Sequence, residues 1–198
     1  MEIFEEDNLY KRIYGGLSMP GQRQGFISII GETNALNVTG DRDLVLLDEA
    51  EDFDAKKLIE LASGLDFRYR CEHWYGDTKG PVSKMLIREM NLFNRGPEGN
   101  KDARDLVISH TRVLDNPKPV QFIYPVLKSR LENVSQKLFP PNSLVASYMR
   151  QIMPEDVASL QIGDYPAIES LSYAVLELTK PIRRGPRQTK ANNDYSRI

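Results

Sequence analysis

The sequence is poor in cysteine and has no long apolar run. Cys71 is the one cysteine among 198 residues, which excludes an internal disulfide and a cysteine-based zinc site. No apolar stretch approaches the roughly 18 to 20 residues needed to span a bilayer. The first residues, MEIFEEDNLYKR, are acidic and lack the apolar centre of a secretory signal. These absences predict a protein of a reducing, cytoplasmic compartment without a membrane partner.

Positive charge is not in excess over the chain as a whole. The formal net charge is −2, so the molecule has no bulk attraction for nucleic acid. Basic residues are concentrated instead in residues 180–198, where Asp194 is the one acidic residue. This composition predicts a disordered tail, either simply solvated or a salt-sensitive contact to phosphates. The expected organisation is an N-terminal extension over 1–9, one domain over 10–179 and the basic tail over 180–198.

The chain does have enough apolar residues, 40%, for one domain with a core. Two β-branched and aromatic runs flank a turn at Pro20 and Gly21, which predicts a hairpin. A third run follows a polar loop, and two more alternate with helical patterns. The predicted strands cover residues 10–17, 25–32, 43–51, 68–76 and 104–111.

Helical periodicity begins after the third strand. Leu58, Leu61, Ala62 and Leu65 share one face of a helix for which Asp54 is the predicted N-cap. A second helix is predicted over residues 81–93, with Val82, Leu86, Met90 and Phe93 on one face. A third is predicted over a segment that contains Ile123, Leu127, Leu131 and Val134, with a kink near Pro125. Two more are predicted over residues 143–152 and 166–179.

The order of these elements is β-β-β-α-β-α-β, followed by helices. Three strands with short links predict an antiparallel meander, and the βαβ units that follow predict parallel strands with right-handed crossovers. We therefore expect an α/β fold with a mixed five-stranded sheet and helices on both faces.

Three stretches of the sequence resemble RNase H-like nucleases. Among these nucleases, they most resemble the C-terminal nuclease domain of phage terminase large subunits. RIYGGLSMPGQRQGFISIIG resembles the first hairpin, WYGDT the end of the fourth strand, and GDYPAIESLSYAVLEL the last helix. The resemblance implies a hydrolase that cuts double-stranded DNA during genome packaging, in the host cytoplasm if viral. It also implies Mg²⁺ or Mn²⁺ and, as partners, a portal and an ATPase motor, whose phosphate loop this sequence lacks.

The resemblance implies catalytic, metal-binding acids at particular positions. Asp77 matches the acid at the tip of the fourth strand, and Glu169 matches the acid of the last helix, with Asp164 as a further candidate. Hard divalent cations prefer oxygen ligands, which is why such a site needs several carboxylates. Lys79, Lys84 and Arg88 are the basic residues that we nominate for contacts to DNA phosphates, with ordinary helix-surface charge as the alternative.

The first-strand acid of this family is missing. Where terminases carry Gly, an apolar residue and Asp, this chain reads Gly16, Leu17 and Ser18. Three interpretations stay open: Glu32 or Glu49 takes over as a ligand, Ser18 is a substitution, or the domain has lost cutting. The rival to a nuclease is a non-catalytic RNase H-like module that binds packaging partners or DNA.

Each candidate also has a purely structural interpretation. Asp77 or Thr78 would cap the helix that begins near Pro81. Glu169 would be an exposed glutamate in the first helical turn, and Asp164 the N-cap of that helix. A structural role is also the simpler expectation for the acidic block 48–54, as a solvent-exposed strand end and loop, and for Cys71, His73 and Trp74. His110, at the end of the fifth predicted strand, is a candidate for a place near the site.

Overall fold

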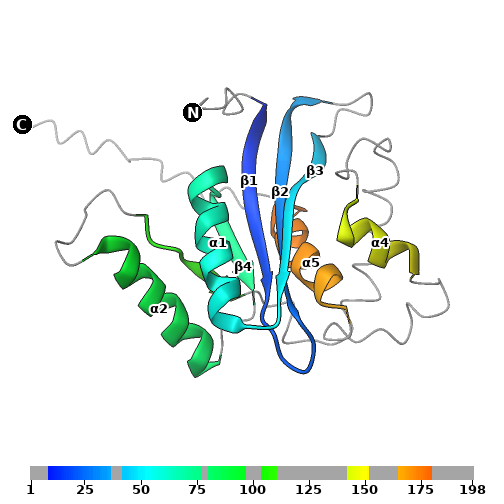
Figure 1. Ribbon diagram of the computed structural model, residues 1–198. Coiled ribbons are helices and arrows are strands. Elements are labelled where there is room, and N and C mark those ends of the chain that lie inside the picture. The colour runs from blue at the N-terminus through cyan, green and yellow to red at the C-terminus, as the bar shows by residue number, and fades with distance from the viewer. Residues whose placement is uncertain are drawn as a thin grey trace, which may run out of the picture.

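The structure is a computed structural model that describes residues 9–36, 42–76, 80–96, 104–110, 142–151 and 165–179. Its helices and strands follow the predicted order (Figure 1). The predicted helix around Ile123 to Val134 and the tail 180–198 lie outside the described residues. The elements are β1 (Tyr10–Ser18), β2 (Gly25–Leu36), β3 (Arg42–Asp52), α1 (Ala55–Tyr69), β4 (His73–Gly76), α2 (Pro81–Arg95), β5 (Ile108–His110), α4 (Leu144–Gln151) and α5 (Pro166–Thr179).

The five strands form one mixed sheet in the order β3-β2-β1-β4-β5. β2 pairs antiparallel with β1 and with β3, whereas β4 pairs parallel with β1 and with β5. This is the meander followed by parallel strands that the sequence predicts. The fold class is therefore α/β, with the mixed five-stranded sheet that the sequence predicts.

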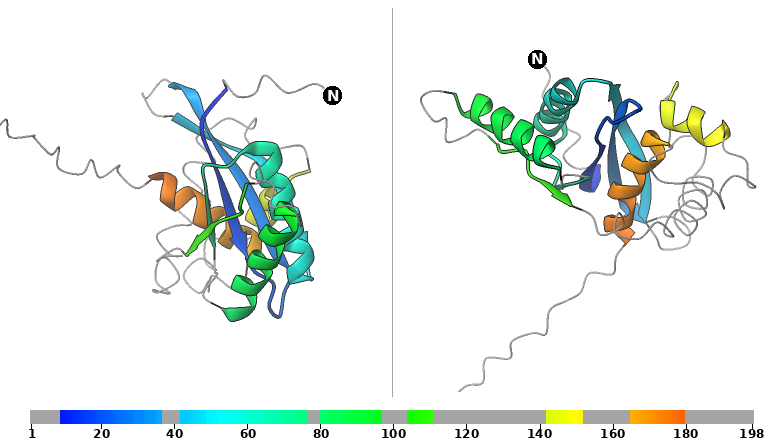
Figure 2. Two further views of the ribbon diagram at one scale, coloured as in Figure 1. Left: turned by 90° about the vertical axis from the view of Figure 1, so that its left-hand side faces the viewer. Right: turned by 90° about the horizontal axis from the view of Figure 1, so that it is seen from below.

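Helices cover both faces of the sheet, as expected. α1 and α2 lie on one side, and α4 and α5 lie on the other, as the view from below shows best (Figure 2). Each side has its own apolar cluster: Leu17, Ile27 and Ile29 face α1, while Phe26 and Ile30 face α5. Because successive side chains of a strand point to opposite faces, neighbouring residues of β2 belong to different clusters.

Alternation along β1 decides which helix each residue meets. Leu17 is fully buried in the cluster on the α1 side. Gly16 and Ser18, one position to either side, therefore face α5. Ser18 is the last residue of the strand and remains only 2% exposed. The chain thus places a buried hydroxyl where β1 ends.

Helix α1 is longer and β4 shorter than predicted. The pattern predicts a helix over residues 54–66 and a strand from residue 68, but α1 continues to Tyr69 and β4 begins only at His73. A β-carbon at Gly64 would meet nothing within 4 Å, so this glycine faces open space and does not stop the helix. α1 ends at Arg70, whose left-handed backbone (φ 50°) allows its N–H to bond Asp66 O. Asp54 is the N-cap, as predicted.

Two further predictions need correction. β5 is confined to Ile108–His110 within the predicted 104–111. The predicted apolar face of α2 is only partly buried, because Leu86 and Met90 pack on the core cluster while Val82 and Phe93 are exposed. α2 therefore rests on the domain by a narrow face and leaves much of its surface open.

The acidic block in β3 has structural roles. A β-bulge between the Ile29 and Ile30 pairings changes the alternation of β3. Asp48 accepts hydrogen bonds from Arg68 and from the Tyr69 hydroxyl. Glu49 accepts from the Val145 N–H and other donors at the start of α4. The prediction of an acidic strand end in solvent is thus wrong for Asp48 and Glu49, which tie β3 to helices on opposite faces.

A buried carboxylate links α1 to β4. Asp66 is 4% exposed and accepts a hydrogen bond of 2.8 Å from the Trp74 indole N–H. Its second oxygen lies 3.1 Å from Nε of Arg104. Burial raises the pKa of the Asp66 carboxyl group, although the bond from Trp74 and the charge of Arg104 act in the opposite direction.

This raised pKa predicts how stability depends on pH. An unfolded aspartate loses its proton near pH 3.9, about the usual value, and folded Asp66 loses it at higher pH. Between these two values the native state binds more protons, so the free energy of unfolding falls as pH rises. Asp66→Asn keeps an acceptor for Trp74 and is expected to lack this fall. Urea unfolding at about pH 4 and at about pH 7 measures this. The free energy of unfolding of the variant, relative to that of the wild type, should be higher at about pH 7 than at about pH 4. The same relative value at both pH values would contradict the prediction.

Within the described ranges, no helix is both long and apolar enough to cross a bilayer.

Candidate functional site

The candidate site begins where α5 packs directly onto β1. A β-carbon at Gly16 would collide with the backbone carbonyl of Ser170, with the carbonyl carbon only 2.8 Å away. Only a glycine allows this approach. Beside it, the hydroxyls of Ser28 and Ser170 lie 2.6 Å apart, so β2 is joined to the same helix. Small residues on both elements therefore hold α5 close against the sheet.

The close approach brings Glu169 of α5 to the end of β1. The Ser18 hydroxyl donates a short hydrogen bond to Oε2 of Glu169. The hydroxyl of Tyr173, one helical turn further on, donates to Oε1. Tyr173 is fully buried and Glu169 is half-buried. Both carboxylate oxygens are thus oriented by buried hydroxyl donors.

The structure decides between the alternatives for Glu169. Glu169 is not an exposed first-turn glutamate, since it contacts the end of β1. The Tyr165 carbonyl accepts the N–H of Glu169 at the start of α5. The interpretation of Asp164 as the N-cap of this helix stays a prediction. The prediction that Asp164 contributes to the site is untested, because that residue lies outside the described ranges.

The end of β4 adjoins the end of β1. Gly76, the last residue of β4, pairs with Leu17, the residue before Ser18. Asp77 follows Gly76 and, like Lys79, lies outside the described residues. α2 begins at Pro81 with Gly80 at the N-cap, so neither Asp77 nor Thr78 occupies the capping position. β4 therefore ends at the same sheet edge that carries Ser18, and Asp77 is the next residue in the sequence.

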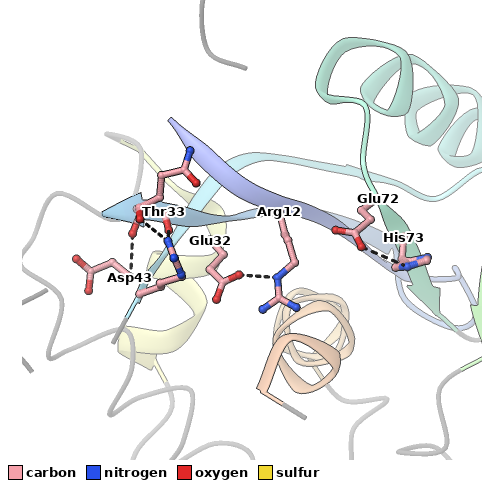
Figure 3. A network of polar contacts seen from close by, with 8 residues as sticks. Arg12, Glu32, Thr33, Asp43, Glu72 and His73 are labelled. Atoms are coloured by element: carbon pink, nitrogen blue, oxygen red, sulfur yellow. Dashed lines mark hydrogen bonds and ion pairs between the residues drawn. The ribbon is translucent and has the colours of Figure 1, made fainter. Parts of the chain in front are cut away.

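The two proposed substitutes for the missing acid differ in position. Glu32 pairs with Arg12 at the opposite end of β1, with 2.6 Å between Oε2 and Nε (Figure 3). Arg12 and Ser18 are six positions apart along the strand, roughly 20 Å, so Glu32 lies away from the site. Glu49 pairs with Ser28 across the sheet and accepts hydrogen bonds from the start of α4. Its replacement of the first-strand acid stays a prediction.

The donor set fits a hard divalent cation only in part. Glu169 supplies a carboxylate and Ser18 a neutral hydroxyl, both of them oxygen donors. Within the described ranges, no three His, Cys, Asp or Glu side chains come together as a metal cluster. A complete ligand set thus requires acids from the neighbouring segments, of which Asp77 and Asp164 are the nearest in sequence.

The other residues singled out in the sequence have structural surroundings. Trp74 is buried, as predicted, and packs over Gly15. Cys71 is buried, and burial raises the pKa of its thiol to about 12, so it stays protonated and inert. His73 is exposed beside Glu72 (Figure 3). Of the basic nominees, Lys84 and Arg88 are exposed on α2.

Sequence reasoning missed Tyr173 and the importance of Gly16. The signal for Tyr173 was present, because it follows Glu169 by four residues and so shares its helix face. The need for a glycine at position 16 becomes visible only when Ser170 is seen against it.

Comparisons with known proteins find similar solved structures but no matching sequence family. No family model and no curated protein matches this chain. Its structure is similar to the large terminase of the thermophilic bacteriophage D6E, with 9% identity and a TM-score of 0.43 over 87% of this chain. It is also similar to the fowlpox virus resolvase solved with Holliday junction DNA, with 13% identity and a TM-score of 0.40 over 85% of this chain.

The two matches differ in how much of the other protein they cover. This chain spans 43% of the length of the terminase but 99% of the resolvase.

Proposed function

We propose that this chain is an RNase H-like domain that hydrolyses phosphodiester bonds of double-stranded DNA with a divalent cation. The observation that carries the proposal is the carboxylate of Glu169, held by Ser18 where β1 ends. β4 ends at the same edge, and its next residue is Asp77. Carboxyl ends of parallel strands are where α/β folds place their sites.

The proposed ligands are Glu169, Asp77 and Asp164, with Mg²⁺ or Mn²⁺ as the cation. When bound, such an ion activates water and neutralises charge on the phosphoryl oxygens. Ser18 and Tyr173 hold the Glu169 carboxylate in one orientation. In genome packaging, the natural partners would be a terminase ATPase motor and a portal.

Ser18 itself favours a second candidate function. Ser18 supplies a neutral hydroxyl at the position where the resemblance implies a carboxylate. This hydroxyl donates a hydrogen bond to Glu169. Fewer negative charges at the site weaken cation binding. The second candidate is therefore a non-catalytic module that keeps the fold and binds DNA or packaging partners.

Nicking of supercoiled plasmid distinguishes the two candidates. We expect the folded protein to cut in Mn²⁺ or Mg²⁺, and EDTA to stop the cutting. Circular dichroism confirms folding of each sample. A folded protein that cuts in neither metal would overturn the nuclease and leave the non-catalytic module.

A further inference from the structure

A second groove of the molecule lies between α2 and the β5 strand. It has a volume of about 460 Å³. Asn91 fixes its two walls to each other, because its side chain donates to the Leu106 carbonyl at 3.0 Å and accepts from the Leu106 N–H at 2.9 Å. The groove is therefore preformed. The lining residues that matter for binding are Lys84, Arg88, Leu92, Arg95, Asp105 and Val107.

Positive charge predominates in this groove although the whole chain is acidic. Arg95 is paired with Asp105 through two hydrogen bonds, so these two charges offset each other. Lys84 and Arg88 are exposed and form no ion pair with a carboxylate of the described residues. Two cations are thus left to attract an anion.

The larger groove, between α1 and α2, lacks this imbalance. It measures about 970 Å³, and Phe67 and Phe93 are exposed on its walls. Its charged residues cancel, so it offers a polyanion no net attraction. They are three cations and three carboxylates: Lys56, Arg70 and Arg104 against Glu60, Asp66 and Glu89.

We propose that the groove between α2 and β5 binds the sugar-phosphate backbone of a DNA duplex. Lys84 and Arg88 are four residues apart on α2, which is about 6 Å along the helix axis. Two phosphates of one strand occupy roughly 7 Å of duplex axis. Because each phosphate of a strand rises about 3.4 Å, this spacing of the two cations suits two phosphates of one strand that are separated by one other.

The chemistry of the groove favours backbone contact over base recognition. Among the residues that the structure describes, no aromatic side chain lines it, so these residues provide no platform on which single-stranded bases would stack. Leu92 and Val107 are exposed and apolar, and they suit contact with sugars. Contacts to phosphate fix the position of a duplex without reading its sequence.

The groove and the candidate site are close in sequence at the start of α2. That helix begins five residues after Gly76, the last residue of β4, and Lys84 lies in its first turn. This inference rests on the proposed function for its choice of DNA as the anion.

Binding of the full chain to a labelled 30-base-pair duplex in EDTA tests the proposal without cutting. Fluorescence anisotropy at several salt concentrations compares the wild type with Lys84→Ala/Arg88→Ala. We expect affinity to fall about tenfold and the slope of log K against log salt to shrink by about two. The control Lys56→Ala/Lys57→Ala removes the same charge from exposed positions on α1 and should bind as the wild type does.

Each outcome supports or overturns the proposal. Unchanged affinity in the α2 variant, or an equal loss in the α1 control, would overturn it. If the α2 variant binds normally while the wild type still nicks plasmid, the groove is wrong and the nuclease stands. If the wild type binds no duplex, both the groove and the proposed action on DNA fail.

Discussion

Gly16→Ala is expected to lower the free energy of unfolding by about 3 kcal/mol, near the upper end for overpacked sites. The added methyl group would collide with the Ser170 carbonyl, which is backbone and has no rotamer to change. Either α5 moves away from β1 or the domain unfolds. In the first case, Glu169 also loses its hydrogen bond from Ser18. Urea unfolding followed by circular dichroism measures the loss.

Gly64→Ala is the matched control. A β-carbon at Gly64, in the middle of α1, meets nothing within 4 Å. Alanine there is expected to stabilise the domain by about 0.5–1 kcal/mol, because glycine costs a helix interior that much. A Gly16→Ala variant as stable as the wild type would show that α5 does not pack on β1 in this way.

The same glycines show what the sequence predicts and what it does not. The order of strands and helices along the chain was predicted from hydrophobic periodicity, and Asp54 was predicted as a cap from local chemistry alone. The helix was predicted only as far as residue 66, and α1 continues to Tyr69 past Gly64, which faces open space. Gly16 looked like an ordinary member of a motif, and its role depends on Ser170, more than 150 residues away. Local patterns carry no information on such contacts.

The candidate site was predictable to a similar degree. The resemblance aligned Ser18 and Glu169 with family positions, and the structure brings these two side chains together. Glu49 illustrates the limit, because an acid in an acidic block proved to hold the start of α4. Val82 and Phe93 illustrate another, since helical spacing shows that residues share a face but not that anything covers it.

Glu169→Gln is expected to lower metal-dependent cutting by at least about 100-fold, more than loss of an outer-shell partner costs. Gln has the shape of Glu, and the hydroxyls of Ser18 and Tyr173 can each donate or accept. The fold should therefore persist while the negative charge that holds a cation is lost. Asp77→Ala should have an effect of the same size if both residues hold one ion.

Ser18→Ala tests the orientation of the Glu169 carboxylate separately from its charge. It removes the hydrogen bond to Glu169 but keeps the carboxylate, so cutting should fall only about tenfold, as for an outer-shell partner. A thermal shift in Mn²⁺ adds a readout that needs no turnover, because a bound ion stabilises the native state. The wild type and Ser18→Ala should melt at higher temperature with Mn²⁺, whereas Glu169→Gln should not. A Glu169→Gln variant that still cuts and is still stabilised would mean that the ion is held without the carboxylate of α5.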